Sequence, residues 1–203
     1  MEDSETTHIP SAVPAILQDT QTLGFRMASE PQTGSLLRCL AASKPAGRLL
    51  ELGTGTGLGT AWLLAGMDPT STLETVDNDD AAQAVARKHL AADRRVRFHV
   101  ADGGEFLRKR VGQRFDLIFA DAWPGKFHDL DLALSWLAPG GLYVIDDLLP
   151  QPSWPEGHAA KVPPLIASLE ANGQLCCTRL AWATGIMIVA RRASDHSEDA
   201  NRC

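Results

Sequence analysis

The sequence predicts an α/β fold in which a mostly parallel, seven-stranded, doubly wound sheet carries helices on both faces. Strand-like and helical segments alternate over most of the 203 residues, which is typical of parallel strands joined by right-handed crossovers. A glycine-rich turn joins the first strand to a helix, and an acidic residue follows each of the first five strands. The last two strands are adjacent in sequence, so we expect a C-terminal hairpin that adds one antiparallel strand to this Rossmann-like sheet.

The first strand is expected at 48–52, where Leu49, Leu50 and Leu52 suit a strand buried on both faces of a sheet. Apolar segments bounded by turn residues predict six further strands, at 72–76, 96–100, 115–120, 142–145, 174–180 and 185–190.

Helices are expected between these strands, where apolar residues recur at helical spacing. Asp79 is expected to cap one helix, and Thr33 or Ser35 another. The expected helices are 13–22, 36–41, 61–65, 80–90, a short one around 106–107, 130–137 and 165–171. The proline-rich residues 148–163 are expected to form a long ordered loop.

The chain is expected to hold a single main domain, since 203 residues suit one core of ordinary size. Residues 1–23 read as an N-terminal polar segment followed by a short helix, and 24–191 as the main domain. Residues 192–203 are small and charged, and we expect a disordered tail there.

Composition excludes several classes of function. The formal net charge is −6, with acids and bases mixed along the chain, so nothing indicates a nucleic-acid partner. The four cysteines show neither metal-binding spacing nor a disulfide framework. No apolar run is long enough to span a bilayer, so we expect no membrane association and a cytoplasmic protein.

The glycine-rich turn reads RLLELGTGTGLGT from residue 48. A dinucleotide fingerprint requires G-x-G-x-x-G, and neither start in this turn places a glycine at the third position. The pattern is instead an acid followed by alternating glycines: Glu51, Gly53, Thr54, Gly55 and Gly57. A carboxylate would repel a pyrophosphate but suits an ammonium group, so we predict that these residues bind S-adenosylmethionine.

Two further acids are expected to complete the cofactor site. Asp77 follows the second strand, twenty residues beyond Gly57, where a carboxylate can accept hydrogen bonds from both ribose hydroxyls. Asp102 follows the third strand and can accept from an adenine amino group. The alternative for any one of these acids is that it caps a helix or a turn.

The remaining strand-end acids are Asp121, Asp146 and Asp147. If they converge, a cation or a shared proton must offset their repulsion. Oxygen ligands suit Mg²⁺, Ca²⁺ or Mn²⁺, and such an ion could lower the pKa of a bound substrate hydroxyl. The alternative is that Asp121 serves the cofactor, Asp146 caps a turn and Asp147 is solvated.

From the glycine turn to the fifth strand, the chain resembles class I S-adenosylmethionine-dependent methyltransferases. FDLIFADAWPGKF and YVIDDLL, which begin at residues 115 and 143, resemble segments of small bacterial O-methyltransferases of the catechol and caffeoyl-coenzyme A type. The resemblance implies that Asp121, Asp146 and Asp147 are metal ligands and that Lys126 is the base, although two extra residues precede this lysine. Homodimers are common in that family, so a homodimer is also an expectation.

We therefore predict an S-adenosylmethionine-dependent O-methyltransferase for a small, aromatic, hydroxylated acceptor. His158 is a second candidate for the base, since imidazole titrates near neutral pH. Trp123 and Trp154 could stack on the acceptor or serve only in packing. The alternatives are a metal-independent N- or carboxyl-methyltransferase and a protein that binds S-adenosylmethionine without catalysis. A nicotinamide-binding protein is a further rival.

Overall fold

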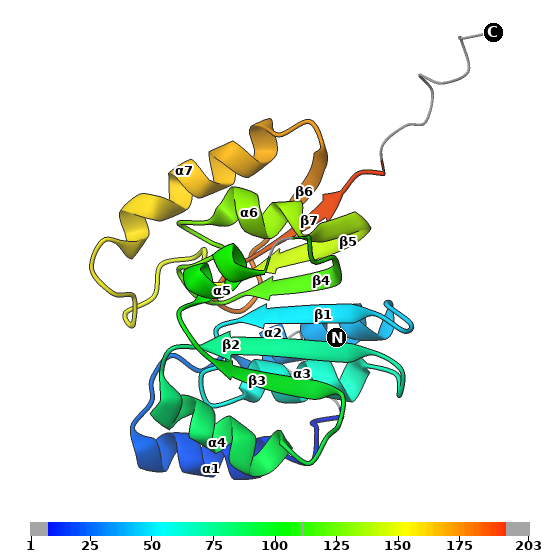
Figure 1. The fold of residues 1–203 in the computed structure, drawn as a ribbon. Helices are drawn as coiled ribbons and strands as arrows, with labels where there is room; N and C mark the ends of the chain where they lie inside the picture. The colour runs from blue at the N-terminus through cyan, green and yellow to red at the C-terminus, as the bar shows by residue number, and fades with distance from the viewer. Residues whose placement is uncertain (1–7, 111, 194–203) are drawn as a thin grey trace, which may run out of the picture.

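The computed structural model describes residues 8–110 and 112–193, which form one seven-stranded sheet with helices on both faces (Figure 1). The strand order is β3-β2-β1-β4-β5-β7-β6. Neighbouring strands are parallel except at β7, which is antiparallel to both β5 and β6. The predicted fold class is confirmed. The strands are β1 (Arg48–Leu52), β2 (Thr72–Asp77), β3 (Val96–Val100), β4 (Phe115–Ala120), β5 (Leu137–Ile145), β6 (Leu175–Leu180) and β7 (Ile186–Arg191).

Two hydrophobic cores lie on opposite faces of this sheet. Leu49 of β1 packs into a core with helices α1 to α4, whereas Leu50 and Leu52 pack into a second core with α5 to α7. This alternation follows from the two-residue period of a strand, and Figure 1 shows α5 and α6 before the sheet and α2 and α3 behind it. The helices are α1 (Val13–Leu23), α2 (Pro31–Ala42), α3 (Leu58–Gly66), α4 (Asp80–Leu90), α5 (Gly103–Lys109), α6 (Leu130–Ser135) and α7 (His158–Ala171).

The largest departure from the sequence prediction is α7. Its expected start lay after the proline-rich loop, but the helix begins at His158 and contains Pro163 and Pro164. Each proline removes one backbone donor. The buried residues Leu165 and Leu169 lie on the side of α7 that faces the second core, and this burial outweighs the lost bonds.

Two smaller corrections concern helix and strand ends. Thr33 does not cap α2, because the helix already begins at Pro31, whose fixed φ suits a first turn. The helix expected to reach residue 137 ends at Ser135, and Leu137 already pairs with Phe115 in the sheet. Pro139, Gly140 and Gly141 lie at an irregularity inside β5, after which pairing resumes at Leu142.

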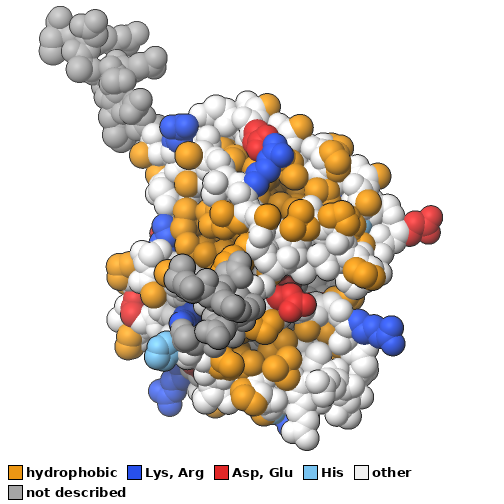
Figure 2. Space-filling view, turned by 180° about the vertical axis from the view of Figure 1, so that it is seen from behind, with side chains coloured by type: hydrophobic (Ala, Val, Ile, Leu, Met, Phe, Trp, Pro, Cys, Tyr) orange, Lys and Arg blue, Asp and Glu red, His pale blue; other side chains and the backbone are white. Residues whose placement is uncertain are grey.

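The termini and the surface bear on the remaining expectations. Most of the predicted tail, and the first seven residues, lie outside the described residues. The N-terminal helix packs into the first core through Val13 and Ile16. On the face seen in Figure 2, acidic and basic side chains are scattered between apolar ones. None of the helices in the described ranges has the length and apolar character needed to cross a bilayer.

Candidate active site

Two adjoining cavities lie where β1, β2 and β4 end at the carboxyl edge of the sheet. The larger has a volume of about 410 Å³ and the smaller about 220 Å³. Their linings share Gly53, Asp77, Asn78, Ala122 and Trp123. Ligands of doubly wound folds bind at this edge, so the pair of cavities is the candidate site.

The glycine turn forms one wall of the larger cavity through Gly53, Thr54 and Gly55. Gly57 has a different role in the structure. It has a φ of 94°, and a Cβ there would lie 2.6 Å from the Cβ of Ala86 in α4. Gly57 lies outside the lining of both cavities, so the structure explains this glycine by the close approach of α4 to the turn.

Asp77 lines both cavities and also organises the turn. Its Oδ2 accepts a hydrogen bond from the backbone N–H of Gly55 at 2.7 Å, and its Oδ1 accepts one from Asp79 at 2.8 Å. Each carboxylate oxygen can accept a further bond. Asp77 is therefore held rigidly where it can also meet two hydroxyl groups.

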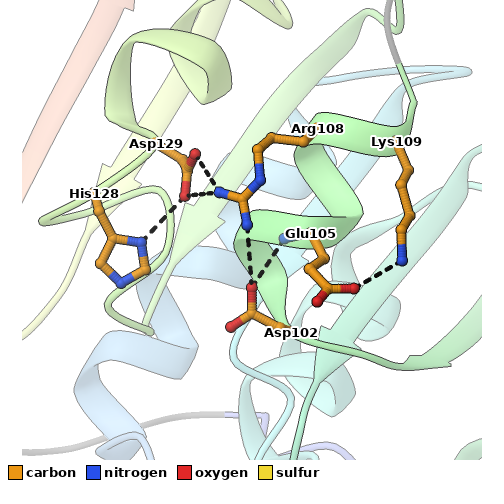
Figure 3. A network of polar contacts seen from close by, with 6 residues as sticks. All are labelled: Asp102, Glu105, Arg108, Lys109, His128 and Asp129. Carbon is orange, nitrogen blue, oxygen red and sulfur yellow. Dashed lines mark hydrogen bonds and ion pairs between the residues drawn. The ribbon is translucent and has the colours of Figure 1, made fainter.

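Asp102 lies at the smaller cavity and begins a polar network (Figure 3). Its Oδ1 accepts from the N–H of Glu105, which caps α5, and lies 3.9 Å from the guanidinium of Arg108. Arg108 also contacts Asp129 in the loop after β4, at 2.7 Å. The network ties α5 to that loop, so the capping alternative holds for Asp102, and its contact with an adenine stays a prediction.

The family described as "Methyltransferase domain" matches residues 50–148, which contain the glycine turn and the strand-end acids up to Asp147. This segment is similar to methyltransferase domains. A relative from Mycolicibacterium vanbaalenii, named "Putative O-methyltransferase", is 32% identical over 123 residues. The match covers 58% of this chain and 54% of the relative, so the chain spans about half the length of the curated relatives it matches.

Solved structures extend the likeness to nearly the whole chain. The O-methyltransferase TomG from Streptomyces achromogenes, in complex with SAM, superposes with a TM-score of 0.80 at 22% identity and covers 94% of each chain. A protein from Klebsiella pneumoniae described as a putative O-methyltransferase has a TM-score of 0.77 at 25% identity and covers 90% of each chain. The chain thus shares the fold of these two proteins.

Glu51 lies fully buried behind the glycine turn. Its Oε2 accepts hydrogen bonds from the hydroxyls of Thr60 at 2.5 Å and Thr75 at 2.6 Å. Its Oε1 has no hydrogen-bond partner among the described residues. Burial raises the pKa of Glu51 to about 8, against the effect of the two hydroxyls. Glu51 lies outside the lining of both cavities, so its contact with the ammonium group of S-adenosylmethionine stays a prediction.

This raised pKa makes stability depend on pH. The ordinary value is 4.5, so the folded state binds the proton of Glu51 more tightly than the unfolded state does. Stability should fall as the pH rises from about 4.5 to about 8 and level off above. Glu51→Gln cannot ionise, and its stability should exceed that of the wild type by a few kcal/mol more at about pH 9 than at about pH 5. Urea denaturation at both pH values tests this, and parallel pH dependences would contradict it.

The three acids that the resemblance implies as metal ligands do not form a ligand set. Asp146 Oδ1 accepts from the Thr184 hydroxyl at 2.5 Å and from the Asp147 N–H at 2.7 Å, and Asp121 Oδ2 accepts from Ser29 at 3.0 Å. Within residues 8–110 and 112–193, no group of three or more His, Cys, Asp or Glu side chains is arranged to hold an ion. The residues as arranged do not fit the divalent ion.

Burial and the charges of neighbouring acids raise the pKa values of Asp121 and Asp146. Burial, followed by the charge of Asp146, raises the pKa of Asp121 well above its usual range, and burial also raises the pKa of Asp146. This favours a protonated carboxyl within the pair over a fully charged cluster. The charge of Lys126 acts in the opposite direction on both.

Lys126 reaches the larger cavity from a loop that is held by its neighbours. The Tyr143 hydroxyl donates to the carbonyl of Gly125 at 2.6 Å, and Gly125 has a φ of 81°. A Cβ at Gly125 would lie 2.4 Å from Leu52 Cδ1. The loop therefore turns Lys126 inward, where it is only 2% exposed yet lines the cavity.

His158 lines the same cavity, because the first turn of α7 carries it there rather than a loop. Its ring stacks on Trp154, with centroids 4.4 Å apart, and meets Phe127 edge-on at 4.8 Å. Burial lowers the pKa of His158, so the neutral ring is favoured. The structure thus brings both candidate bases to one cavity, together with Trp123.

Proposed function

We propose that this protein transfers the methyl group of S-adenosylmethionine to a hydroxyl oxygen of a small aromatic acceptor. One observation supports this most strongly: a single cavity is lined by the glycine turn and Asp77 on one side and by Trp123, Lys126 and His158 on the other. A donor on the turn would have its reactive end next to the titratable side chains. A protein that only sensed the donor would not need that second wall.

The donor-binding side is assigned from the residues of this chain. Gly53, Thr54 and Gly55 would lie against the polar part of the donor, and Asp77 would accept from its ribose. The ammonium group of the donor would favour the ionised form of Glu51 behind the turn. S-adenosylmethionine supplies an electrophilic methyl group on a sulfonium. The role of the chain is to orient the acceptor oxygen toward that methyl and to exclude water.

The acceptor-binding side favours a flat ring. Trp123 and His158 line the larger cavity with ring centroids 6.4 Å apart, and Phe127 and Trp154 pack against these two rings. Aromatic walls of this kind bind flat, partly polar molecules. The small volume of the cavity favours a small-molecule acceptor over a macromolecule.

The proposal is tested by calorimetry with S-adenosylmethionine and by methyl transfer to phenols, catechols, carboxylic acids and amines, with mass spectrometry of the products. We expect binding of the donor and O-methylated phenols or catechols. Since the acids do not fit a divalent ion, turnover should persist after full chelation with EDTA.

Each rival has its own result in these assays. Methylation of amines or carboxylates alone would favour the N- or carboxyl-methyltransferase. Donor binding with no transfer to any acceptor would favour the sensor, and preference for NADH over S-adenosylmethionine would overturn the proposal. Loss of turnover on chelation, restored by Mg²⁺, would contradict metal independence only.

A further inference from the structure

His158 is held in one tautomer by its backbone contact. Its Nε2 lies 3.0 Å from the carbonyl oxygen of Asp147. A carbonyl oxygen can only accept a hydrogen bond, so Nε2 carries the hydrogen. In the neutral ring, Nδ1 then has a free lone pair. It is buried and has no hydrogen-bond partner within the described ranges.

The ring of His158 is also fixed in orientation. Trp154 stacks on one face at an interplanar angle of 21°, and Phe127 packs against the ring at 89°. His158 is 2% exposed. A buried acceptor atom left without a donor costs about 1–3 kcal/mol, and such an unsatisfied group in a fixed ring indicates that a ligand supplies the missing hydrogen.

Lys126 presents the complementary group. Its ammonium lies 5.9 Å from the centre of the same Phe127 ring. In the part of the chain that the structure describes, this ammonium forms neither a hydrogen bond nor an ion pair, although the side chain is 2% exposed. Lys126 and His158 line the same cavity, and both contact the Phe127 ring. The cavity thus offers one unused acceptor and one unused cationic donor.

A hydroxyl group satisfies both at once, since its oxygen accepts while its hydrogen donates. We propose that the acceptor hydroxyl binds between these groups, with His158 Nδ1 as the base and the Lys126 ammonium as the cation that stabilises the resulting oxyanion. This division of roles rests on the proposed function. The O–H bond breaks and its proton moves to Nδ1. The acceptor oxygen then forms the O–C bond as the S–C bond of the donor breaks, and that electron pair stays on sulfur.

Two catechols of different acidity separate the roles. The hydroxyl of 4-nitrocatechol is acidic enough to ionise without a base near neutral pH, whereas that of catechol is not. His158→Gln keeps an N–H for the Asp147 carbonyl but lacks the basic nitrogen. Its kcat for catechol should fall on the order of 100-fold, while its kcat for 4-nitrocatechol should stay within about threefold of the wild type. Lys126→Met should lower kcat/KM for both by on the order of 100-fold.

The matched control is a histidine-to-glutamine substitution outside both cavities. His99 lies on β3, pairs with Glu74 at 2.9 Å and lies outside the lining of both cavities. His99→Gln should therefore leave both rates unchanged. Thermal melting and calorimetry with S-adenosylmethionine should show that His158→Gln and Lys126→Met are folded and bind the donor.

A binding measurement tests the roles without turnover. In the presence of S-adenosylhomocysteine, 4-nitrocatechol at a mildly acidic pH should show its visible anion band when it binds the wild type. With His158→Gln it should bind in the neutral form, and Lys126→Met should bind the anion at least about tenfold more weakly.

Three results would overturn the inference: equal losses of kcat for both catechols in His158→Gln, an unchanged anion band in that variant, or no binding and no turnover of either catechol by the wild type. Donor binding and transfer to other acceptors remain separate measurements, so the proposed function can survive this failure.

Discussion

Asp77→Ala is expected to lower the affinity for S-adenosylmethionine by at least on the order of 100-fold. The carboxylate holds two backbone N–H groups, of Gly55 and Asp79, and in the proposed complex accepts from the ribose as well. Hydrogen bonds to a charged group contribute roughly 1.5–3 kcal/mol each, and tenfold in affinity corresponds to about 1.4 kcal/mol. Loss of the side chain therefore both loosens the turn and removes the ribose contact. Calorimetry with the donor measures the effect.

Asp80→Asn is the control for the loss of charge alone. Asp80 lies in the first turn of α4, its side chain is 71% exposed, and it pairs with Arg87. Its substitution should leave the affinity for the donor within about twofold, since exposed pairs contribute little. Equal affinities for Asp77→Ala and the wild type would remove Asp77 from the donor site.

Gly125→Val is expected to lower kcat on the order of 100-fold while the affinity for the donor changes by less than about threefold. A side chain at this φ of 81° is strained, and its Cβ would lie 2.4 Å from Leu52 Cδ1 and 2.8 Å from the Tyr143 hydroxyl. The loop must shift to relieve these contacts, and Lys126 moves with it. Steady-state kinetics with a catechol that the wild type methylates measure kcat, and calorimetry with S-adenosylmethionine measures the affinity for the donor.

The strain of a positive φ must be separated from the clash. Gly140 has a φ of 74° in β5, and a Cβ there would have nothing within 4 Å. Gly140→Ala should therefore cost only the backbone term, roughly 1–2 kcal/mol of stability, and leave kcat unchanged. If Gly125→Val retains wild-type kcat, the loop does not position Lys126.

Much of the fold could be predicted from the sequence, because buried strands and the glycine turn leave local patterns. Six strands lie within one residue of their expected bounds, whereas β5 begins at Leu137 rather than at 142. The sequence predicts the start of α7 several residues too late, because Pro163 and Pro164 disfavour a helix there. Packing against the second core explains why the helix nevertheless includes them. In α7, tertiary packing therefore outweighs the low helix propensity of proline.

The candidate site was harder to predict because its decisive contacts join distant residues. Ser29 donates to Asp121 across 92 positions, and Thr184 donates to Asp146 across 38. Single hydroxyl residues leave no sequence pattern, so neither contact could have been inferred. Strand order did bring the acids to one edge, and side-chain direction then gave Asp146 the Thr184 hydroxyl and the Asp147 N–H as partners.

His158 and Tyr143 show the same limit. The proline-rich context suggested a loop for His158, and only the start of α7 and the stack on Trp154 give its ring a fixed place. Tyr143 is the single tyrosine of the chain. Its hydroxyl holds the loop that carries Lys126, yet from its place in an apolar strand it reads only as a core residue.

The two cores determine how cooperatively the protein unfolds. Adjacent residues of one strand belong to different cores: Ile118 to the one with α5 to α7, and Phe119 to the one with α1 to α4. Melting either layer of helices would expose a full face of the strands that the other layer needs. Neither layer can therefore unfold and leave a stable remainder, so the chain denatures as one cooperative unit, and damage on either face lowers the melting temperature of the whole.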